Sequence, residues 1–487
     1  MKSYIGLDLG TSSLKLLWAD AAGEIKNECS KTYRYAVPET EYHEIAPSVW
    51  QKTLEEGLSE LLAGGSPEER ASVAAIGVTG QMHTTVFLDR DGESIRPAIL
   101  WNDVRTRDMV AEVRKKIAET PTPAGIYGMI STGSPAMNLY WLKEEEPFHF
   151  ERLAHFLIGP DYIVYALTGE ISTDYCDAST SSLYDYSRER WSEEVRAVLG
   201  LSVNIYPPIR PSGVSAGTLL PAYREKYGLG AIPVTVGTGD NAAAALSMGI
   251  LGTGRAALSL GTSGVLIFER EEADFEKKGK HIAFSISGEP PRMLVQGVLQ
   301  SVGNTIDWWM KEILGGASFD EELSGFDASK LGEGRLLFYP YLMGDKTIYQ
   351  APGLRAAFIG LGAETRRRDM LISIFEGIAF GVKRLVEEME VPKSKLLPLL
   401  VTGGGAKNPL WLEILANVLE TEVRTGSSGD AVLGAVRLAR CCVGEPLEVE
   451  TKERGDRSLY APCPVIAARY RQKYRLFKGL HDALRPY

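Results

Sequence analysis

The sequence predicts an α/β protein built from two related domains, and three observations support this prediction. The chain has 487 residues, which is enough for two domains of roughly 200 to 250 residues each. Segments with the pattern of buried strands alternate with segments of helical periodicity, which indicates layers of helices and sheet. Two similar glycine-rich segments, DLGTSS from Asp8 and SLGTSG from Ser259, lie about half the chain apart, each between two predicted strands.

The first half opens with the pattern of a β-meander. Two short apolar runs, 4–9 and 14–18, flank the first glycine turn, and a third strand follows the DAAGE turn and continues to about Tyr35. In the segment 47–63, which begins with Pro47, apolar residues recur at helical spacing. A buried strand is expected at 73–80. Four further helices are expected in this half, at 102–118, 135–145, 159–168 and 191–200.

The second half continues the alternation of strands and helices. Residues 232–250 have the pattern of a strand, a glycine turn and a helix, and residues 255–270 have that of two strands joined by a turn. We expect one domain at 1–250 and a second at 251–487. The remaining elements expected are strands at 336–342 and 398–402 and helices at 302–313, 366–389, 408–419, 430–440 and 464–485.

The overall composition argues against several classes of protein. A net charge of −10 without a clustered basic face disfavours binding to nucleic acid or to an anionic membrane. The five cysteines are an odd number without a CxxC pair, which disfavours a disulfide framework and favours a reducing compartment. No stretch reaches the roughly 20 apolar residues that span a bilayer, and the first residues lack a signal-peptide core. We therefore expect a cytoplasmic protein without nucleic-acid or membrane partners.

The first glycine turn concentrates chemical groups that a plain hairpin does not need. Within a few residues it brings together Asp8, Thr11, Ser12, Ser13 and Lys15. A glycine turn lets backbone N–H groups and hydroxyls converge on phosphate oxygens, and a lysine can offset phosphate charge. An acid beside a phosphate requires a divalent cation between them, and Mg²⁺ needs only one or two carboxylates. An ordinary hairpin turn is the alternative interpretation of these residues.

The segment GTGDNA, residues 237–242, admits two interpretations. It fits the GxGxxA dinucleotide fingerprint, because it follows a predicted strand and precedes a predicted helix. However, Asp240 lies inside that loop, where it would repel a pyrophosphate, and no acid closes the following strand at Ser259 to Gly261. An acid at the start of a helix can instead serve as a general base, because the helix dipole favours its ionised form.

Three further segments have the composition of a ligand site. The triple-glycine turn of VTGGGAKNP, residues 401–409, could admit an adenine or a ribose against its backbone. Packing at the start of a helix explains that turn equally well. Two clusters at strand ends combine hydrogen-bonding groups with a face for C–H groups, as a sugar pocket requires; they contain Gln81, Met82 and His83, and Trp101, Asn102, Asp103 and Arg105.

These motifs resemble those of the FGGY carbohydrate kinases, and the resemblance covers essentially the whole chain. GLDLGTSSLK is similar to the first phosphate motif of that family, LSLGTSG to its second, and TGGGAKNPLW to its adenosine motif. A further signature is matched from Gly133 to Glu145 except at Asn138, where the family pattern has lysine, and another at Gly360, Asp369, Ser373 and Glu376. The resemblance implies an α/β, two-domain actin/hexokinase/Hsp70-like (ribonuclease H-like) ATPase fold with a central cleft.

The resemblance also implies roles for individual residues. Asp240 would be the catalytic base, and Asp8 would bind Mg²⁺. Contacts to the sugar would come from Met82, His83, Trp101, Asn102, Asp240 and Asn241. Contacts to ATP would come from Thr11, Ser12, Ser13, Lys15, Gly261, Thr262, Gly303, Gly404, Gly405 and Asn408.

Within the family, the segments GQMH, ILWND, GDNAAAA and FYPYLMGDKT are most similar to those of xylulokinases. The resemblance therefore implies a kinase that uses ATP to phosphorylate the terminal hydroxyl of an open-chain sugar, converting D-xylulose to D-xylulose 5-phosphate. Ribulose, gluconate and glycerol are alternative acceptors. An actin-like ATPase without a sugar acceptor and a catalytically silent sugar sensor are alternative classes of protein. Dimers are common in the family, so the resemblance also implies a homodimer.

Overall fold

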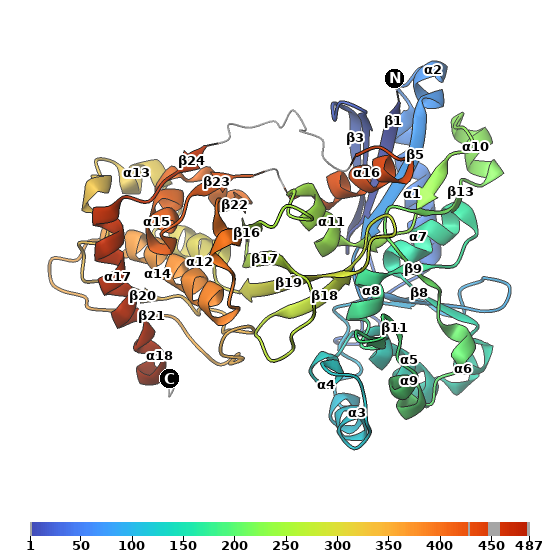
Figure 1. The fold of residues 1–487 in the computed structure, drawn as a ribbon, viewed down its shortest axis with the longest axis horizontal. Helices are drawn as coiled ribbons and strands as arrows, with labels where there is room; N and C mark the ends of the chain where they lie inside the picture. The colour runs from blue at the N-terminus through green and yellow to red at the C-terminus, as the bar shows by residue number, and fades with distance from the viewer. Residues whose placement is uncertain (1, 427–428, 447–457, 485–487) are drawn as a thin grey trace.

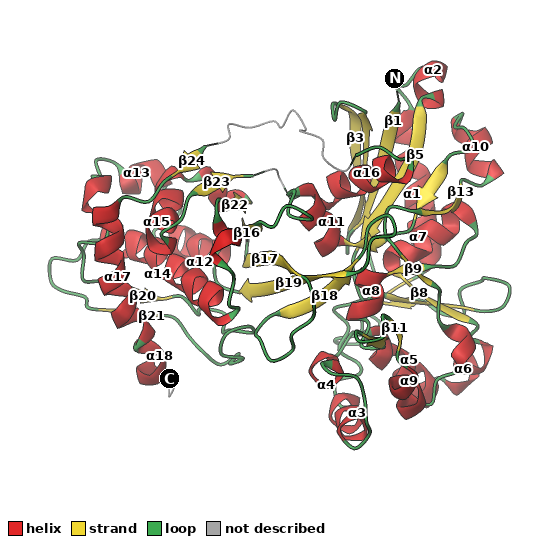
Figure 2. Cartoon of the chain, in the orientation of Figure 1, coloured by secondary structure: helices red, strands yellow, loops and turns green. Residues whose placement is uncertain are grey.

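A computed structural model of the protein describes residues 2–426, 429–446 and 458–484 (Figure 1). The structure is α/β, as the alternating patterns predict. Two seven-stranded sheets, one formed from each half of the chain, are flanked by helices (Figure 2). Within the described residues, none of the helices combines the length and the apolar character that crossing a membrane would require.

The sheet of the first half contains the predicted meander. Its strand order is β13-β14-β5-β1-β2-β3, and β15 also pairs with β5. The hairpin β1-β2 and the pair β2-β3 are antiparallel, whereas β5 runs parallel to β1. Every residue of β1 is buried, as expected for a strand in the middle of a sheet covered on both faces. The strands are β1 (Ser3–Leu9), β2 (Ser13–Asp20), β3 (Ile25–Thr32), β5 (Val73–Gly80), β13 (Ser215–Thr218), β14 (Pro233–Thr235) and β15 (Thr238–Gly239).

The sheet of the second half repeats this arrangement. Its order is β18-β19-β17-β16-β22-β23-β24, with β16-β17 and β17-β19 antiparallel and β22 parallel to β16. The series β22-β16-β17-β19 thus corresponds to β5-β1-β2-β3, which is the arrangement that the paired glycine turns predict. The strands are β16 (Ala256–Leu260), β17 (Gly264–Arg270), β18 (Lys280–Phe284), β19 (Arg292–Leu299), β22 (Leu399–Thr402), β23 (Val423–Thr425) and β24 (Leu459–Tyr460).

Smaller sheets and helices complete the two halves. A four-stranded sheet has the order β4-β7-β6-β8, and three strand pairs are β9-β12, β10-β11 and β20-β21. These strands are β4 (Glu44–Ile45), β6 (Thr85–Leu88), β7 (Ala98–Ile99), β8 (His155–Ile158), β9 (Thr173–Asp174), β10 (Tyr184–Asp185), β11 (Arg190–Trp191), β12 (Ile209–Arg210), β20 (Leu337–Tyr339) and β21 (Ala357–Ile359). The helices of the first half are α1 (Pro47–Leu62), α2 (Pro67–Ala71), α3 (Met109–Ala118), α4 (Ile126–Met129), α5 (Pro135–Glu145), α6 (Pro147–Arg152), α7 (Gly159–Thr168), α8 (Tyr175–Thr180), α9 (Glu193–Leu199), α10 (Pro221–Tyr227) and α11 (Asp240–Ser247). Those of the second half are α12 (Gly303–Trp308), α13 (Phe319–Leu323), α14 (Arg367–Glu388), α15 (Pro409–Leu419), α16 (Ala431–Cys442), α17 (Pro464–Lys478) and α18 (Leu480–Leu484).

Helix α16 belongs to the second half of the sequence but packs on the sheet of the first half, against β1, β5 and α11 (Figure 1). Glycines make this close packing possible. A Cβ at Gly77 would lie 1.8 Å from the carbonyl oxygen of Ala435, and one at Gly434 would lie 2.1 Å from that of Ala243. The two halves are therefore joined by a helix as well as by the chain at 250/251. The domain boundary at that point stays a prediction.

Several predicted helices differ from the structure at their ends. The helix expected at 102–118 begins only at Met109, because Asp103 accepts a hydrogen bond from the backbone N–H of Arg105 and holds a loop there. The helix expected at 464–485 is interrupted at Gly479, a weak helix former, and residue 485 lies outside the described residues. The helix expected at 302–313 is α12 followed by a wider π-helical turn at Trp309–Ile313.

Candidate active site

The first glycine turn joins β1 to β2 and carries the predicted phosphate-binding residues. The N–H of Gly10 donates to the carbonyl oxygen of Ser13 at 2.9 Å, and the hydroxyl of Tyr33 donates to the carbonyl oxygen of Gly10. The backbone N–H of Tyr33 donates to the carbonyl oxygen of Ser12 at 2.9 Å. The hydroxyl of Thr11 accepts a hydrogen bond from the indole Nε1 of Trp101 at 2.9 Å. The turn therefore touches one of the predicted sugar-binding residues.

The second glycine turn, between β16 and β17, is closed in the same way. The N–H of Gly261 donates to the carbonyl oxygen of Ser263 at 3.0 Å. The N-terminus of α12 packs directly on this turn, because the N–H of Gly303 donates to the carbonyl oxygen of Gly261 at 2.9 Å. A Cβ at Gly303 would lie 2.4 Å from that same oxygen. Asn304 in turn donates its N–H to the carbonyl oxygen of Thr262 at 3.1 Å.

The triple-glycine turn after β22 lies against the second glycine turn. Gly403 has a φ of 88°, and a Cβ there would lie 2.7 Å from the carbonyl oxygen of Leu260. A Cβ at Gly405 would lie 2.6 Å from the ring of Trp411, whereas one at Gly404 would meet no atom within 4 Å. Asn408 caps α15 by accepting the N–H of Trp411 at 3.1 Å. Packing therefore accounts for Gly403, Gly405 and Asn408, and the backbone at Gly404 is open.

Asp8 and Asp240 lie close enough to repel each other. Burial and then the charge of Asp240 raise the pKa of the Asp8 carboxyl to about 7, while Lys15 opposes this shift. Lys15 faces Asp8 across the β1-β2 pair. Asp240 is the first residue of α11, where burial raises its pKa to about 6 against the lowering effects of the Asn241 N–H and Lys280. Thr79 of β5 pairs both with Asp8 and with Thr238, two residues before Asp240, so the two carboxylates belong to one site.

Asp430 is a third carboxylate at this site, which sequence reasoning missed. It caps α16 and lies 3.8 Å from Lys15 Nζ, and its charge also raises the pKa of Asp8. Its neighbour Gly429 packs near the end of β22, because a Cβ there would lie 3.4 Å from the hydroxyl oxygen of Thr402. A sequence signal for Asp430 exists, because Gly429-Asp430 precedes a helix just as Gly239-Asp240 does.

Two of the predicted sugar-binding residues, Met82 and Asn241, meet at the start of α11. Met82 is buried, and its sulfur accepts a hydrogen bond from Nδ2 of Asn241 at 3.2 Å. His83 has a φ of 68°, an uncommon backbone conformation for a residue other than glycine, and such strain concentrates at functional sites. Trp101 is half exposed, and its backbone N–H donates to the hydroxyl of Thr84 at 3.2 Å. Met82 and Asn241 thus make direct contact although they lie far apart in the sequence.

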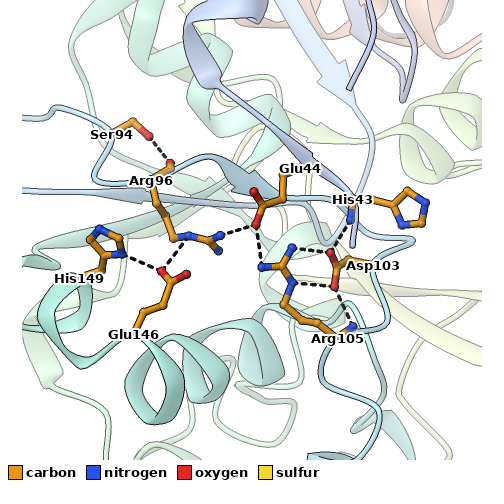
Figure 3. Close-up of polar contacts among 8 residues, drawn as sticks. All are labelled: His43, Glu44, Ser94, Arg96, Asp103, Arg105, Glu146 and His149. Atoms are coloured by element: carbon orange, nitrogen blue, oxygen red, sulfur yellow. Dashed lines mark hydrogen bonds and ion pairs between the residues drawn. The ribbon is translucent and has the colours of Figure 1, made fainter. Parts of the chain in front are cut away.

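A buried network of ion pairs contains Asp103 and Arg105, which follow Trp101 and Asn102 closely in the chain (Figure 3). Arg105 Nη2 lies 2.7 Å from Asp103 and Arg105 Nη1 lies 2.8 Å from Glu44, which also binds Arg96. The polar groups of Asp103 and Arg105 are therefore engaged with each other and with Glu44. The Oδ1 atom of Asn102, by contrast, is buried without a hydrogen-bond partner among the described residues.

Three fully buried aspartates, Asp161, Asp174 and Asp177, lie close to one another and to the start of α11. Asp174 accepts hydrogen bonds from the hydroxyls of Ser212, at 2.7 Å, and Thr238. Both carboxyl oxygens of Asp177 lack a hydrogen-bond partner within the part of the chain that the structure describes. Burial, and then the charges of Asp174, Asp161 and Asp240, raise the pKa of Asp177 well above its ordinary value.

We expect the Asp177→Asn substitution to stabilise the protein increasingly as the pH rises. A raised pKa means that the folded state binds the proton more tightly than the unfolded state, so stability falls as the pH passes from about 4 upwards through the folded-state pKa. Asparagine has no proton to lose. Apparent unfolding midpoints of both proteins, measured by calorimetry between pH 5 and 8, should diverge toward pH 8. A constant difference would contradict a strongly raised pKa at this position.

Lys280 is a further candidate site residue that sequence reasoning missed. It is an exposed lysine at the first position of β18, and its Nζ lies 3.1 Å from Nε2 of His83. No motif marks it, because its role depends on a contact between residues almost 200 positions apart. The contact joins the sheet of the second half to a predicted sugar-binding residue of the first half.

Comparisons with known proteins agree with this architecture. Residues 3–247 match the N-terminal domain of the FGGY family of carbohydrate kinases, and residues 256–441 match its C-terminal domain. The chain is 32% identical over 487 residues to a xylulose kinase of Bacillus subtilis (strain 168), covering 99% of this chain and 97% of that protein. It is 27% identical over 494 residues to a xylulose kinase of Escherichia coli (strain K12), covering 99% of both.

A solved structure supports the same fold. The crystal structure of a xyloylose kinase from Brucella ovis has a TM-score of 0.88 and 28% sequence identity to this chain, with 99% of each chain covered. The two-domain actin/hexokinase/Hsp70-like fold that the resemblance implies is thereby confirmed. The family's activity implies ATP and a small sugar as substrates. The chain belongs to the FGGY family of carbohydrate kinases.

Proposed function

We propose that this protein transfers the γ-phosphoryl group of ATP to the C5 hydroxyl of D-xylulose, which yields D-xylulose 5-phosphate and ADP. Relatives that carry the name xylulose kinase match the chain over nearly its whole length. The observation that carries the proposal is the proximity of Asp8 and Asp240, with a glycine turn beside Asp8 and polar side chains beside Asp240.

Asp240 has the position and the charge of a general base. In the proposed reaction its carboxylate accepts the hydroxyl proton while the hydroxyl oxygen bonds to the γ-phosphorus and the bond from phosphorus to the ADP oxygen breaks. A base is most effective when its pKa lies near the working pH, and burial raises the pKa of Asp240 to about 6. The N-terminal position on α11 favours the ionised form.

The two glycine turns would hold the phosphates from opposite halves of the chain. Thr11, Ser12, Ser13 and Lys15 would act on one side, and Gly261, Thr262 and Gly303 on the other. Because phosphoryl transfer needs little covalent chemistry from the protein, positioning and charge compensation supply most of the acceleration. The open backbone at Gly404 would admit the adenosine.

The donor set fits a divalent cation at Asp8. The charges of Asp240 and Asp430 repel the Asp8 carboxylate, and a bound divalent cation would relieve that repulsion. Asp8 would therefore hold the Mg²⁺ that accompanies ATP, and the ion would supply neutralisation of phosphate charge. A cytoplasmic location is supported by the absence of disulfides among the described cysteines. The homodimer stays a prediction.

A panel of acceptors tests the proposed function. ADP release would be measured with D-xylulose, ribulose, gluconate, glycerol and several hexoses, each with Mg²⁺ and ATP, and without any acceptor. We expect D-xylulose to give the highest kcat/KM and the reaction without acceptor to be slow. A higher kcat/KM with another acceptor would contradict xylulose as the substrate. Rapid ADP release without any acceptor would indicate an actin-like ATPase, and no release at all would indicate a sugar sensor.

A further inference from the structure

Two polar side chains of the second-half sheet face the predicted sugar-binding residues of the first half. Lys280 on β18 and Gln296 on β19 are directly opposite each other in an antiparallel strand pair. Residues paired in this way place their side chains on the same face of the sheet, next to each other. Lys280 and Gln296 therefore form one polar pair on one face.

Each member of this pair contacts a different predicted sugar-binding residue. Lys280 Nζ lies 3.1 Å from Nε2 of His83, and Gln296 Nε2 donates to Oδ1 of Asn241 at 3.3 Å. Asn241 in turn donates from Nδ2 to the sulfur of Met82 at 3.2 Å. These contacts involve three residues of the first half, namely His83, Asn241 and Met82. The family resemblance assigns sugar contacts to all three.

The charges around Lys280 favour a cation at this point. The surrounding protein lowers the pKa of the Lys280 ammonium by desolvation, and the nearby carboxylates of Asp240 and Asp177 oppose that shift. His83 is neutral here, because burial and the positive charge of Lys280 lower its pKa well below the ordinary value. The neutral imidazole can accept a hydrogen bond from the ammonium at Nε2.

The contact with His83 leaves hydrogen-bonding capacity on Lys280. An ammonium carries three N–H donors, and the imidazole nitrogen uses one of them. The side chain is exposed and lies within electrostatic reach of the proposed catalytic base, Asp240. Hydroxyl and carbonyl oxygens of an open-chain sugar are acceptors for such donors.

We propose that Lys280, supported by Gln296, is a substrate-positioning residue whose ammonium donates hydrogen bonds to oxygens of the sugar, so that both halves of the protein bind the acceptor beside Asp240. This inference rests on the proposed kinase function. It extends the sugar site beyond the motifs of the first half. It also makes the second-half sheet a determinant of which acceptor is used.

Steady-state kinetics of Lys280 variants test this inference. For the best acceptor of the panel, Lys280→Met should raise the KM of the sugar roughly 10- to 100-fold, the effect of losing a hydrogen bond from a charged group. The KM of ATP should remain unchanged, and kcat should change much less than the sugar KM. Lys280→Arg keeps the charge and the donors, so it should recover part of the sugar affinity. Lys52→Met removes an exposed lysine of α1 and serves as the control.

A double-mutant cycle tests whether Lys280 and His83 act together, and the comparison of the sugar KM with the ATP KM separates this role from a simple link between the two halves. His83→Ala and Lys280→Met should raise the sugar KM by less in combination than the product of their separate effects, because both act on one bound oxygen cluster. An unchanged sugar KM in Lys280→Met, with an active parent enzyme, would overturn the inference and leave the kinase function intact. Equal losses for ATP and sugar would overturn it as well, since they indicate a structural link. A parent enzyme that phosphorylates no acceptor would overturn both proposals.

Discussion

The Asp240→Asn variant should bind ATP and sugar as the parent protein does but lose turnover by a factor of roughly 10² to 10⁴, the usual contribution of a general base. Asparagine has nearly the same size as aspartate and keeps one oxygen at the start of α11, but it cannot accept the hydroxyl proton. The measurement is kcat with saturating ATP and sugar, together with calorimetric binding of each ligand.

The pH dependence of the same variant provides a second measurement. The pKa of Asp240 is raised to about 6, so kcat/KM of the parent enzyme should rise with pH through this region as the base becomes ionised. The residual activity of Asp240→Asn should lack this rise. Asp91→Asn, at an exposed turn between β6 and β7, is the matched control and should behave as the parent. Near-normal turnover in Asp240→Asn would exclude this residue as the base.

The Asp8→Asn variant should lose roughly 10² to 10³ of kcat, the effect of removing one electrostatic stabiliser of a developing charge. Asparagine keeps an oxygen at the end of β1 but removes the negative charge that would hold Mg²⁺. The Mg²⁺ concentration that gives half-maximal rate should therefore increase. The measurement is the rate of ADP formation as Mg²⁺ is varied at constant free ATP.

Asp430 offers a matched comparison for the Asp8 variant. Asparagine caps a helix about as well as aspartate does, so Asp430→Asn keeps the cap of α16 and removes a charge 3.8 Å from Lys15. Its effect on the Mg²⁺ dependence should be smaller than that of Asp8→Asn. If Asp8→Asn kept the Mg²⁺ dependence of the parent, Asp8 would not be the residue that holds the cation.

Local patterns in the sequence were sufficient to predict the hairpins and most of the helices. The β1-β2 hairpin around Gly10 and the β16-β17 hairpin around Gly261 follow from apolar runs on either side of a glycine turn. The start of α3 was not predictable in this way. Residues before Met109 have helical periodicity, but Asp103 and Arg105 are held in a loop by Glu44, which lies far away in the sequence.

The candidate site shows the same division between local and tertiary information. The motifs identify Asp8 and Asp240 because an acid beside a glycine turn or at a helix start has a recognisable chemical meaning. Lys280 has no such context, and its position beside His83 results from the packing of β18 against the first half. The residue pairs Lys280–His83 and Gln296–Asn241 could therefore be found only in the folded chain.

The packing of α16 on β1 and β5 has a consequence for protein synthesis. A ribosome delivers the first sheet long before residues 431–442, so Gly6 and Gly77 stay uncovered until almost the entire polypeptide has emerged. A nascent chain stalled after residue 250 should therefore bind a hydrophobic dye and be cleaved readily by protease. A chain stalled late enough to free α16 from the exit tunnel should resist both.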